Sequence, residues 1–212
     1  MKSKVVIVGA GGHAKVVVDI LKSIGQYNIV GLTDSCKIGS SVQGIKVIGD
    51  DSILAHLFAN GIHHAFVAIG GNKKRKEIYQ HLKLLGYQFI NAISPFAYVS
   101  PTAKLGEGVA VMPGAVINAE ASVGNNVIIN TGATIDHDTV IESFSHIAPG
   151  TNIAGNVHVE EGAMIGTGAR IIPKVKVGKW TVVGAGAVVI RDVNDFEKVA
   201  GVPARNIEWP QT

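Results

Sequence analysis

The sequence has few of the features that would link it to an oxidising compartment, a membrane or a nucleic acid. Its single cysteine, Cys36, excludes an intramolecular disulfide. The opening apolar run, Val5 to Val8, is far too short for a signal peptide or a membrane span and leads directly into glycines. The net charge of +3, from 19 basic and 16 acidic side chains, comes without a basic tract. We therefore expect a cytoplasmic protein that binds neither nucleic acid nor membranes.

Aromatic residues are also scarce, at 6% of the chain, although 47% of the residues are hydrophobic. This shortage indicates a core built from stacked aliphatic side chains. The second half of the chain supplies them at a fixed interval, because every sixth residue from 99 to 189 is valine, isoleucine or leucine. The sixteen positions are Val99, Leu105, Val111, Ile117, Val123, Ile129, Ile135, Ile141, Ile147, Ile153, Val159, Ile165, Ile171, Val177, Val183 and Val189.

Two residues before each of these positions, the chain always carries Ala, Val, Thr or Ser. A period of six fits neither an α-helix nor the simple alternation of a strand. It fits hexapeptide repeats, in which each repeat forms one face of a parallel β-helix and three repeats close a triangular coil, so about five coils are expected. The branched residues should stack inside, with the small residues at the corners. Glycines that follow the aliphatic position are expected to relax the backbone there: Gly106, Gly124, Gly166, Gly178 and Gly184.

The first ninety residues have a different pattern, which predicts a separate α/β domain. A β-branched run over 4–8 leads into a Gly-Ala-Gly-Gly-His turn and a helical pattern that ends at Gly25. Strand, glycine turn and helix open a nucleotide-binding α/β unit. We expect a Rossmann-like domain over 1–94 and a β-helix domain over 95–212. The other elements expected in the first domain are strands over 28–32, 65–69 and 88–93 and a helix over 73–85.

Ligands of open parallel sheets bind beyond the carboxyl ends of the strands. That edge collects the glycine turn after the first strand, an acidic residue after the second, and Gly70-Gly71-Asn72 after the third. Glycines permit close approach of a phosphate to a helix N-terminus, and the carboxylate can hold a sugar hydroxyl. A full dinucleotide fold would need about twice this length, so we do not expect NAD. The candidate ligand-binding residues are Gly11, Gly12, His13, Asp34 and Gly70.

One stretch inside the repeats, residues 130–138, gathers polar side chains. Because Ile135 points inward, His137, two residues later, should project outward. A general base needs a pKa near the working pH and an orienting acceptor for its second ring nitrogen, and His137 beside Asp138 offers both. His146 lies nine residues further on, half a coil away and therefore on a different face. Only a neighbouring subunit could bring these two histidines into one site.

The motifs in combination resemble the sialic-acid O-acetyltransferase-like family of hexapeptide-repeat sugar acetyltransferases. They are the hexapeptide run, the GAGGH turn, the IGGNKKR stretch, the Asp-His-Asp triplet and the terminal AGVPAR. Within that family the chain is most similar to the bacterial nucleotide-amino-sugar N-acetyltransferases of the bacillosamine and perosamine type. The resemblance implies a left-handed β-helix, an exception to the usual right-handed crossover, in a homotrimer with its active sites between subunits. It also implies acetyl-CoA as co-substrate, a nucleotide-amino-sugar as substrate, and no metal.

The resemblance also implies roles for individual residues. His137 is the implied base, and Asp138 stands where some members have a glutamate that raises the basicity of this histidine. Three residues match positions that contact acetyl-CoA in the family: His146, Thr167 and Ala185. Thr167 stands where the family has an aliphatic residue. The sugar-nucleotide site is matched by Gly11, Gly12, His13, Asp34 and Gly70, with Gly11 where a serine can occur.

The reaction expected from this resemblance is direct transfer of an acetyl group from CoA to the amine of a nucleotide-linked 4-amino-4,6-dideoxy sugar. A covalent enzyme intermediate is not expected, because Cys36 lies outside the repeats and no serine stands in a nucleophile turn. Three alternatives stay open. An O-acetyltransferase acting on a sialic-acid-type hydroxyl would use the same histidine. A zinc hydratase would need His137, His146 and His158 to converge between subunits. A purely structural or binding β-helix would show outward stripes of one residue type, and the sequence does not.

Overall fold

The computed structural model describes residues 2–208 and divides into two compact units, Met1–Pro95 and Phe96–Thr212. The predicted boundary, between residues 94 and 95, lies one residue earlier. Residues 1 and 209–212, at the outer ends of the two predicted domains, lie outside the described part of the chain. Within residues 2–208, none of the helices has the length and apolar character needed to span a bilayer.

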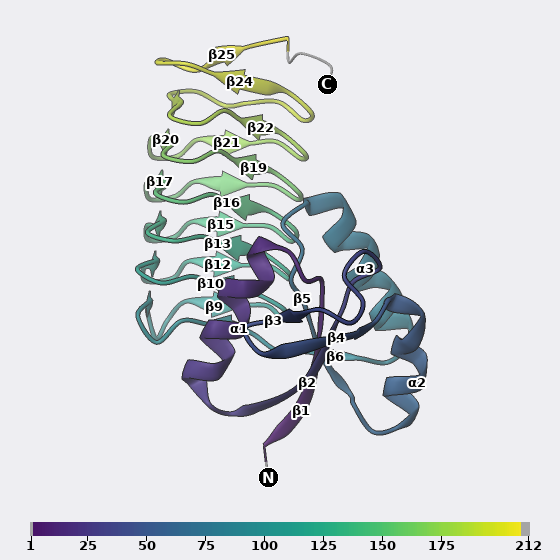
Figure 1. Cartoon of the computed structure of the whole chain (residues 1–212). Coiled ribbons are helices and arrows are strands. Elements are labelled where there is room, and N and C mark those ends of the chain that lie inside the picture. The colour runs from purple at the N-terminus through teal and green to yellow at the C-terminus, as the bar shows by residue number, and fades with distance from the viewer. Residues whose placement is uncertain (1, 209–212) are drawn as a thin grey trace. The chain divides into compact units, whose positions relative to one another are not determined.

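The first unit is an α/β domain around a six-stranded sheet of order β3-β4-β2-β1-β5-β6. β1 pairs in parallel with β2 and with β5, so their carboxyl ends lie at one edge (Figure 1). β3 pairs antiparallel with β4. The strands are β1 (Ser3–Val8), β2 (Tyr27–Thr33), β3 (Ser41–Val42), β4 (Ile45–Gly49), β5 (His64–Val67), β6 (Gln88–Phe89) and β7 (Ala92–Ile93), and the helices are α1 (Gly12–Ile24), the 3₁₀ turn η1 (Asp51–Ile53), α2 (Leu54–Ala59) and α3 (Asn72–Leu84).

Local sequence explains the ends of these elements. The β-branched run of β1 is buried, as a central parallel strand requires. α1 ends at Gly25, which takes a left-handed φ of 70° and donates its N–H to the carbonyl of Leu21 at 3.1 Å. Two expectations needed correction. The predicted strand over 88–93 is two short strands, β6 and β7, and the elements from β3 to α2 were not predicted.

The second unit is the predicted left-handed parallel β-helix, in which two-residue strands stack in three faces (Figure 1). The first face holds β8 (Tyr98–Val99), β11 (Val116–Ile117), β14 (Thr134–Ile135), β17 (Asn152–Ile153), β20 (Arg170–Ile171) and β23 (Val188–Val189). The second face holds β9 (Lys104–Leu105), β12 (Ser122–Val123), β15 (Val140–Ile141), β18 (His158–Val159) and β21 (Lys176–Val177). The third face holds β10 (Ala110–Val111), β13 (Ile128–Ile129), β16 (His146–Ile147), β19 (Met164–Ile165), β22 (Val182–Val183), β24 (Lys198–Ala200) and β25 (Arg205–Asn206).

The aliphatic residues that recur every six positions form the core of this three-sided β-helix, which we call the prism. Ile117, Ile135 and Ile153 follow one another up the first face at intervals of 18 residues, and each is buried. From β8 to β23, parallel pairing places each strand residue beside the residues 18 positions before and after it, whereas Val182 pairs with Lys198, 16 positions on. The dry aliphatic stack stabilises a unit that has few aromatic side chains.

The turns between faces contain a second frame that the sequence reading missed. From 108 to 186, every sixth residue has a positive φ, and half of these residues are not glycine. Glycine, asparagine and aspartate suit this left-handed conformation. Asp138 is one of the residues that adopt it. The glycines predicted to relax the backbone do not have positive φ. They are glycines because a Cβ would collide with the next coil, as at Gly166, where it would lie 2.6 Å from the nitrogen of Ala185.

Candidate functional site

His137 lies in the turn between β14 and β15, at the corner where the first face meets the second. Its side chain is 56% exposed, which confirms the predicted outward direction. The inward place in this repeat belongs to Ile135, which is fully buried. An exposed imidazole on a rigid corner can meet a substrate without opening the core.

The neighbouring carboxylate fixes one nitrogen of this imidazole. Nδ1 of His137 lies 2.7 Å from Oδ2 of Asp138. When Nδ1 carries the proton and donates it to Asp138, Nε2 is left with a lone pair that can accept a proton. Asp138 has a φ of 57°, so the corner turn itself brings this carboxylate back beside the ring.

A second carboxylate holds the backbone of the same residue. Oδ1 of Asp136 accepts the N–H of His137 at 2.8 Å and also the side-chain amide of Asn118 at 3.1 Å. Asn118 belongs to the preceding coil, so the turn that carries His137 is tied to the coil below it. These two bonds lower the pKa of Asp136, and the charge of its carboxylate interacts with that of His137.

The two aspartates change the titration of the histidine. The pKa of His137 is raised above its ordinary value, first by the hydrogen bond to Asp138 and then by the charges of Asp136 and Asp138. A higher pKa makes the imidazole a stronger base, although a smaller fraction of it is neutral at a given pH.

A shallow groove follows the first face away from this corner. It has a volume of about 480 Å³ and begins at Asn118 and Asp136. Its walls are largely aliphatic, and Ile172 and Ile190, which follow β20 and β23, are both exposed on this face. The lining residues are Asn118, Thr134, Asp136, Asn152, Ile153, Ala154, Arg170, Ile171, Ile172, Pro173 and Val188.

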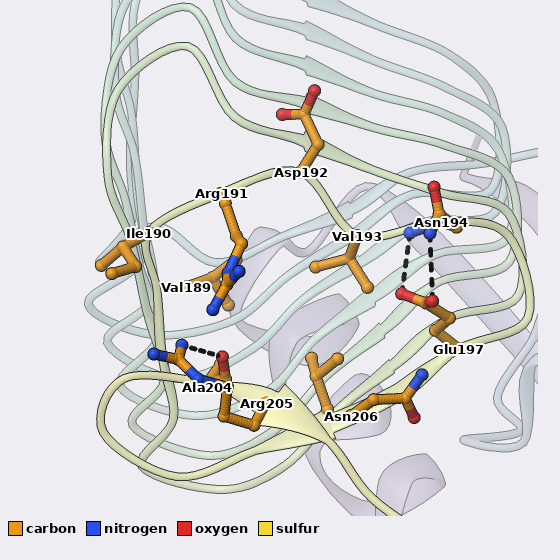
Figure 2. Close-up of a pocket in the computed structure, with 11 residues that line it drawn as sticks. Val189, Ile190, Arg191, Asp192, Val193, Asn194, Glu197, Ala204, Arg205 and Asn206 are labelled. Carbon is orange, nitrogen blue, oxygen red and sulfur yellow. Dashed lines mark hydrogen bonds between the residues drawn. The ribbon is translucent and has the colours of Figure 1, made fainter.

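A second pocket, of about 270 Å³, lies at the C-terminal end of the prism (Figure 2). Figure 2 shows the side chains of Arg191 and Arg205 on one side of it, while Asp192 points away from both. Asp192 accepts the backbone N–H of Lys176, and Glu197 accepts hydrogen bonds from Asn194. The pocket therefore holds two arginines and two carboxylates, and its arginines lie together on one side.

Arg191 stands at the same corner as His137. The register of the first face places Thr134, Asn152, Arg170 and Val188 above one another, and each is followed three residues later by a corner residue. Arg191 is therefore three coils from His137, which is about 14 Å at the usual spacing of paired strands.

The residues matched to acetyl-CoA lie elsewhere on the prism. His146 is in β16 on the third face, where its Nε2 lies 3.0 Å from the amide nitrogen of Asn130. Thr167 and Ala185 are exposed and occupy adjacent coils at the corner between the third and first faces. One chain therefore does not bring His146, Thr167 or Ala185 to His137.

The histidines considered as zinc ligands also diverge within one chain. His137 is at a corner, His146 is on the third face, and His158 is on the second face in β18. Nε2 of His158 lies 2.8 Å from Oε1 of Glu142. Glu142, His158 and Glu160 lie close enough together to ligate an ion, but Glu160 is paired with Lys176 at 3.1 Å.

In the first unit, the predicted crevice is a small cavity of about 150 Å³ at the carboxyl ends of β1, β2 and β5. Its lining includes Gly9, Asp34, Asp51 and Lys74. Of the predicted ligand-binding residues, Asp34 lines this cavity, whereas Gly11, Gly12, His13 and Gly70 do not. Asp34 accepts the N–H of Ala10 at 3.1 Å through Oδ2 and that of Cys36 at 3.0 Å through Oδ1. The carboxylate therefore shapes the glycine turn as well as facing the crevice.

The glycines in the turns after β1 and β5 are of two kinds. Gly9 has a φ of 103°, and a Cβ there would lie 2.9 Å from the carbonyl oxygen of Ala68. At Gly11, Gly12 and Gly70, φ is not positive and a Cβ would meet nothing within 4 Å. Neither the backbone nor packing within the chain requires glycine there, and the open space suits close approach of a ligand. His13 is half-buried in the first turn of α1.

Sequence reasoning did not identify the role of Arg75, which holds the loop between β5 and α3 in place. Its side chain is 1% exposed, and its guanidinium donates to the carbonyls of Ile69 and Gly70 and to Oδ1 of Asn72. Burial lowers the pKa of Arg75 to about 10. The signal was its position one turn into α3, directly after the Gly-Gly-Asn loop that it holds.

Comparison with known proteins gives these features a context. Residues 4–82 match the family described as PglD N-terminal domain, and residues 156–191 match the family described as bacterial transferase hexapeptide, six repeats. A variant of perosamine N-acetyltransferase from Caulobacter crescentus, solved with CoA and GDP-perosamine, is 44% identical to this chain. That match covers 97% of both chains with a TM-score of 0.94.

Two further relatives point the same way. The acetyltransferase domain of PglB from Neisseria gonorrhoeae, solved with acetyl coenzyme A, is 38% identical over 98% of this chain and 100% of that chain, with a TM-score of 0.93. UDP-N-acetylbacillosamine N-acetyltransferase of Bacillus subtilis is 39% identical over 110 residues, which is 51% of this chain. The chain spans half or less of the length of the curated relatives it matches. The predicted fold class and family resemblance are confirmed.

The geometry at the corner predicts a specific titration. Followed by NMR, the imidazole of His137 should have a pKa above about 6.5, the ordinary value, because Asp138 accepts its hydrogen bond. Asp138→Asn removes the charge but keeps a residue that tolerates positive φ. The pKa of His137 should then fall, with the other histidine resonances as internal reference. An unchanged pKa in this variant would show that Asp138 does not act on the ring.

Proposed function

Because the chain belongs to the bacterial nucleotide-amino-sugar N-acetyltransferases, we propose that it transfers the acetyl group of acetyl-CoA to the amine of a nucleotide-linked 4-amino-4,6-dideoxy sugar. The observation that carries the proposal is the exposed imidazole of His137, held by Asp138 and adjacent in sequence to Asp136, which lines a groove on the first face. Relatives of 44% and 38% identity, solved with CoA and GDP-perosamine or with acetyl coenzyme A, support it.

In this reaction His137 moves one proton. Its Nε2 accepts a proton from the sugar amine while the amine nitrogen bonds to the thioester carbon and the bond from that carbon to sulfur breaks. The imidazolium, stabilised by Asp138, then returns the proton to the departing thiolate. The products are an amide and free CoA. Cys36, in the first unit after β2, takes no part in this direct transfer.

We place acetyl-CoA along the groove of the first face. The thioester would lie at His137, the flexible arm along the aliphatic walls near Ile172, and the phosphates toward Arg191 and Arg205. The three coils between His137 and Arg191, about 14 Å, suit an extended arm between the two ends. The two arginines on one side of the terminal pocket supply charge for the phosphates (Figure 2).

The nucleotide-sugar would use the crevice of the first unit. Open space at Gly11, Gly12 and Gly70 admits a phosphate, and Asp34 lines the cavity at the ends of the strands. Transfer to a sugar hydroxyl would need the same base, but the perosamine relative, which matches over 97% of both chains, is named an N-acetyltransferase, which favours the amine. We propose the cytoplasm as the compartment, where an exposed, free Cys36 stays reduced.

The distribution of candidate residues supports a homotrimer. His137 lies at the corner between the first and second faces, whereas His146 lies on the third face and Thr167 and Ala185 lie at the corner between the third and first faces. If a neighbouring chain lays its third face against the groove of the first, both sets line one acetyl-CoA site. A site that is incomplete in one chain requires such an assembly.

The activity itself is the first test. Purified protein should release CoA from acetyl-CoA in the presence of a UDP-, GDP- or dTDP-linked 4-amino sugar, and mass spectrometry should show an amide. His137→Ala should lower kcat by about 10² to 10⁴-fold, because the exposed side chain contributes to proton transfer and not to the core. Activity retained in His137→Ala but abolished in His146→Ala would move the base to His146.

The crevice is tested by separating the two Michaelis constants. Asp34→Ala should raise the KM for the nucleotide-sugar and leave that for acetyl-CoA nearly unchanged, because Asp34 lies in the first unit and holds the turn at Ala10. Asp34→Asn retains an acceptor oxygen and serves as the milder control. An equal rise in both constants would show that the nucleotide-sugar binds elsewhere.

Mixed assemblies test whether the site is shared. Homotrimers of His137→Ala and of Thr167→Trp should each be nearly inactive. In mixed trimers at equal input, about one quarter of the sites should combine two intact halves, and activity should return in that proportion. Mixed trimers that recover nothing, or a fully active monomer by light scattering, would refute the shared site.

A further inference from the structure

Gly155 lies directly against the ring of His137 in the next coil. It stands 18 residues later at the same corner, and the N–H of its neighbour Asn156 donates to the carbonyl of His137 at 3.0 Å. A Cβ on Gly155 would lie 2.7 Å from both Cε1 and Nε2 of His137 and 3.2 Å from Cδ2. Real Cβ atoms essentially never approach other atoms so closely. The imidazole therefore occupies the space that any side chain at residue 155 would take.

The backbone does not require glycine at this position. The left-handed residue of the turn is the next one, Asn156, with a φ of 60°, whereas Gly155 does not have positive φ. The same corner in neighbouring coils carries Ala119, Pro173 and Arg191. The position two residues after each inward aliphatic residue recurs every six residues from 107 to 191. Residue 155 is the one glycine among these positions. The one glycine of this series therefore stands where the coil meets the ring of His137.

We propose that Gly155 is a positioning residue for His137. Its missing side chain leaves the space in which the imidazole lies with Nδ1 on Asp138 and its Cε1–Nε2 edge beside residue 155. Asp136 holds the backbone of His137, Asp138 holds Nδ1 of the ring, and Gly155 leaves room for the ring edge that carries Nε2. The consequence for catalysis rests on the proposed function, whereas the placement of the ring does not.

The proposal predicts an unusual combination of effects. In Gly155→Ala the new methyl group displaces the end of an exposed, flexible side chain, so the fold should lose little stability. The displaced ring should lose its bond to Asp138, and the pKa of His137 should fall toward about 6.5. Turnover should drop at least about tenfold, without exceeding the 10² to 10⁴-fold loss of a missing base, while both KM values stay nearly constant.

The matched control is Ala119→Gly, the reverse exchange at the same corner one coil earlier, where the titration of His137 and the turnover should be unchanged. The decisive comparison is NMR titration of His137 in the wild type, Gly155→Ala and Ala119→Gly. An unaltered pKa of His137 in Gly155→Ala would overturn the proposal. A lowered pKa with full turnover would instead refute the role of His137 as base, which keeps the two claims separate.

A double variant covers the case in which Gly155→Ala folds poorly. In His137→Ala the ring is absent, so adding Gly155→Ala should cost neither further turnover nor melting temperature. If the double variant is as well folded and as active as His137→Ala alone, the collision with the ring is the cause and the proposal holds. If the defect of Gly155→Ala persists without the ring, its cause is the backbone and the proposal fails.

Discussion

Everything in the second unit depends on the stacking of coils at an interval of 18 residues. Two-residue parallel strands pair each residue with those one coil before and after it, and the buried aliphatic column holds that register. A slip of one residue would turn inward side chains outward, so the register tolerates no drift. The corner chemistry follows from this constraint. Asn118 lies beneath Asp136, Gly155 lies above His137, and Arg191 stands three coils further along the same edge.

The same constraint explains what could be read from the sequence. The period of six fixed the inward column and the three faces, and from Ile135 it followed that His137 points outward. The positive-φ frame was equally periodic but was hidden, because residues as different as Glu120, Phe144 and Trp180 occupy it. Tertiary pairing forces these residues into a conformation that local propensity would not predict. Gly106 and its four equivalents were interpreted by backbone freedom, whereas their actual reason is contact with the next coil.

In the first unit the limits were different. Long elements with strong periodicity, such as α1, were predictable. β3, β4 and α2 were missed because short elements between residues 35 and 62 give too little pattern to recognise. Arg75 was missed because a buried arginine that holds carbonyl oxygens looks, in sequence, like one more cation on a basic helix. The open space at Gly11 and Gly70 could come only from coordinates, since sequence alone leaves packing as an equal explanation.

The proposed function gives each of the two units a different task. Under the proposed function, the prism places His137 as the base, an aliphatic groove and a pocket with two arginines in sequence, and the α/β unit would bind the phosphate-bearing sugar. Rigid placement suits a reaction whose protein chemistry is one proton transfer, because orientation then contributes much of the rate. In the proposed homotrimer, His146, Thr167 and Ala185 would acquire a role when a second chain packs against the groove.

The central claim is that His137 faces the reacting amine. A crystal structure of the protein with CoA and a nucleotide-linked amino sugar tests it most directly. The account predicts the sugar amine within about 3 Å of Nε2 of His137, with the CoA sulfur beside it and the phosphates toward Arg191 of the same chain. An amine bound beside His146, with His137 turned to solvent, would contradict it.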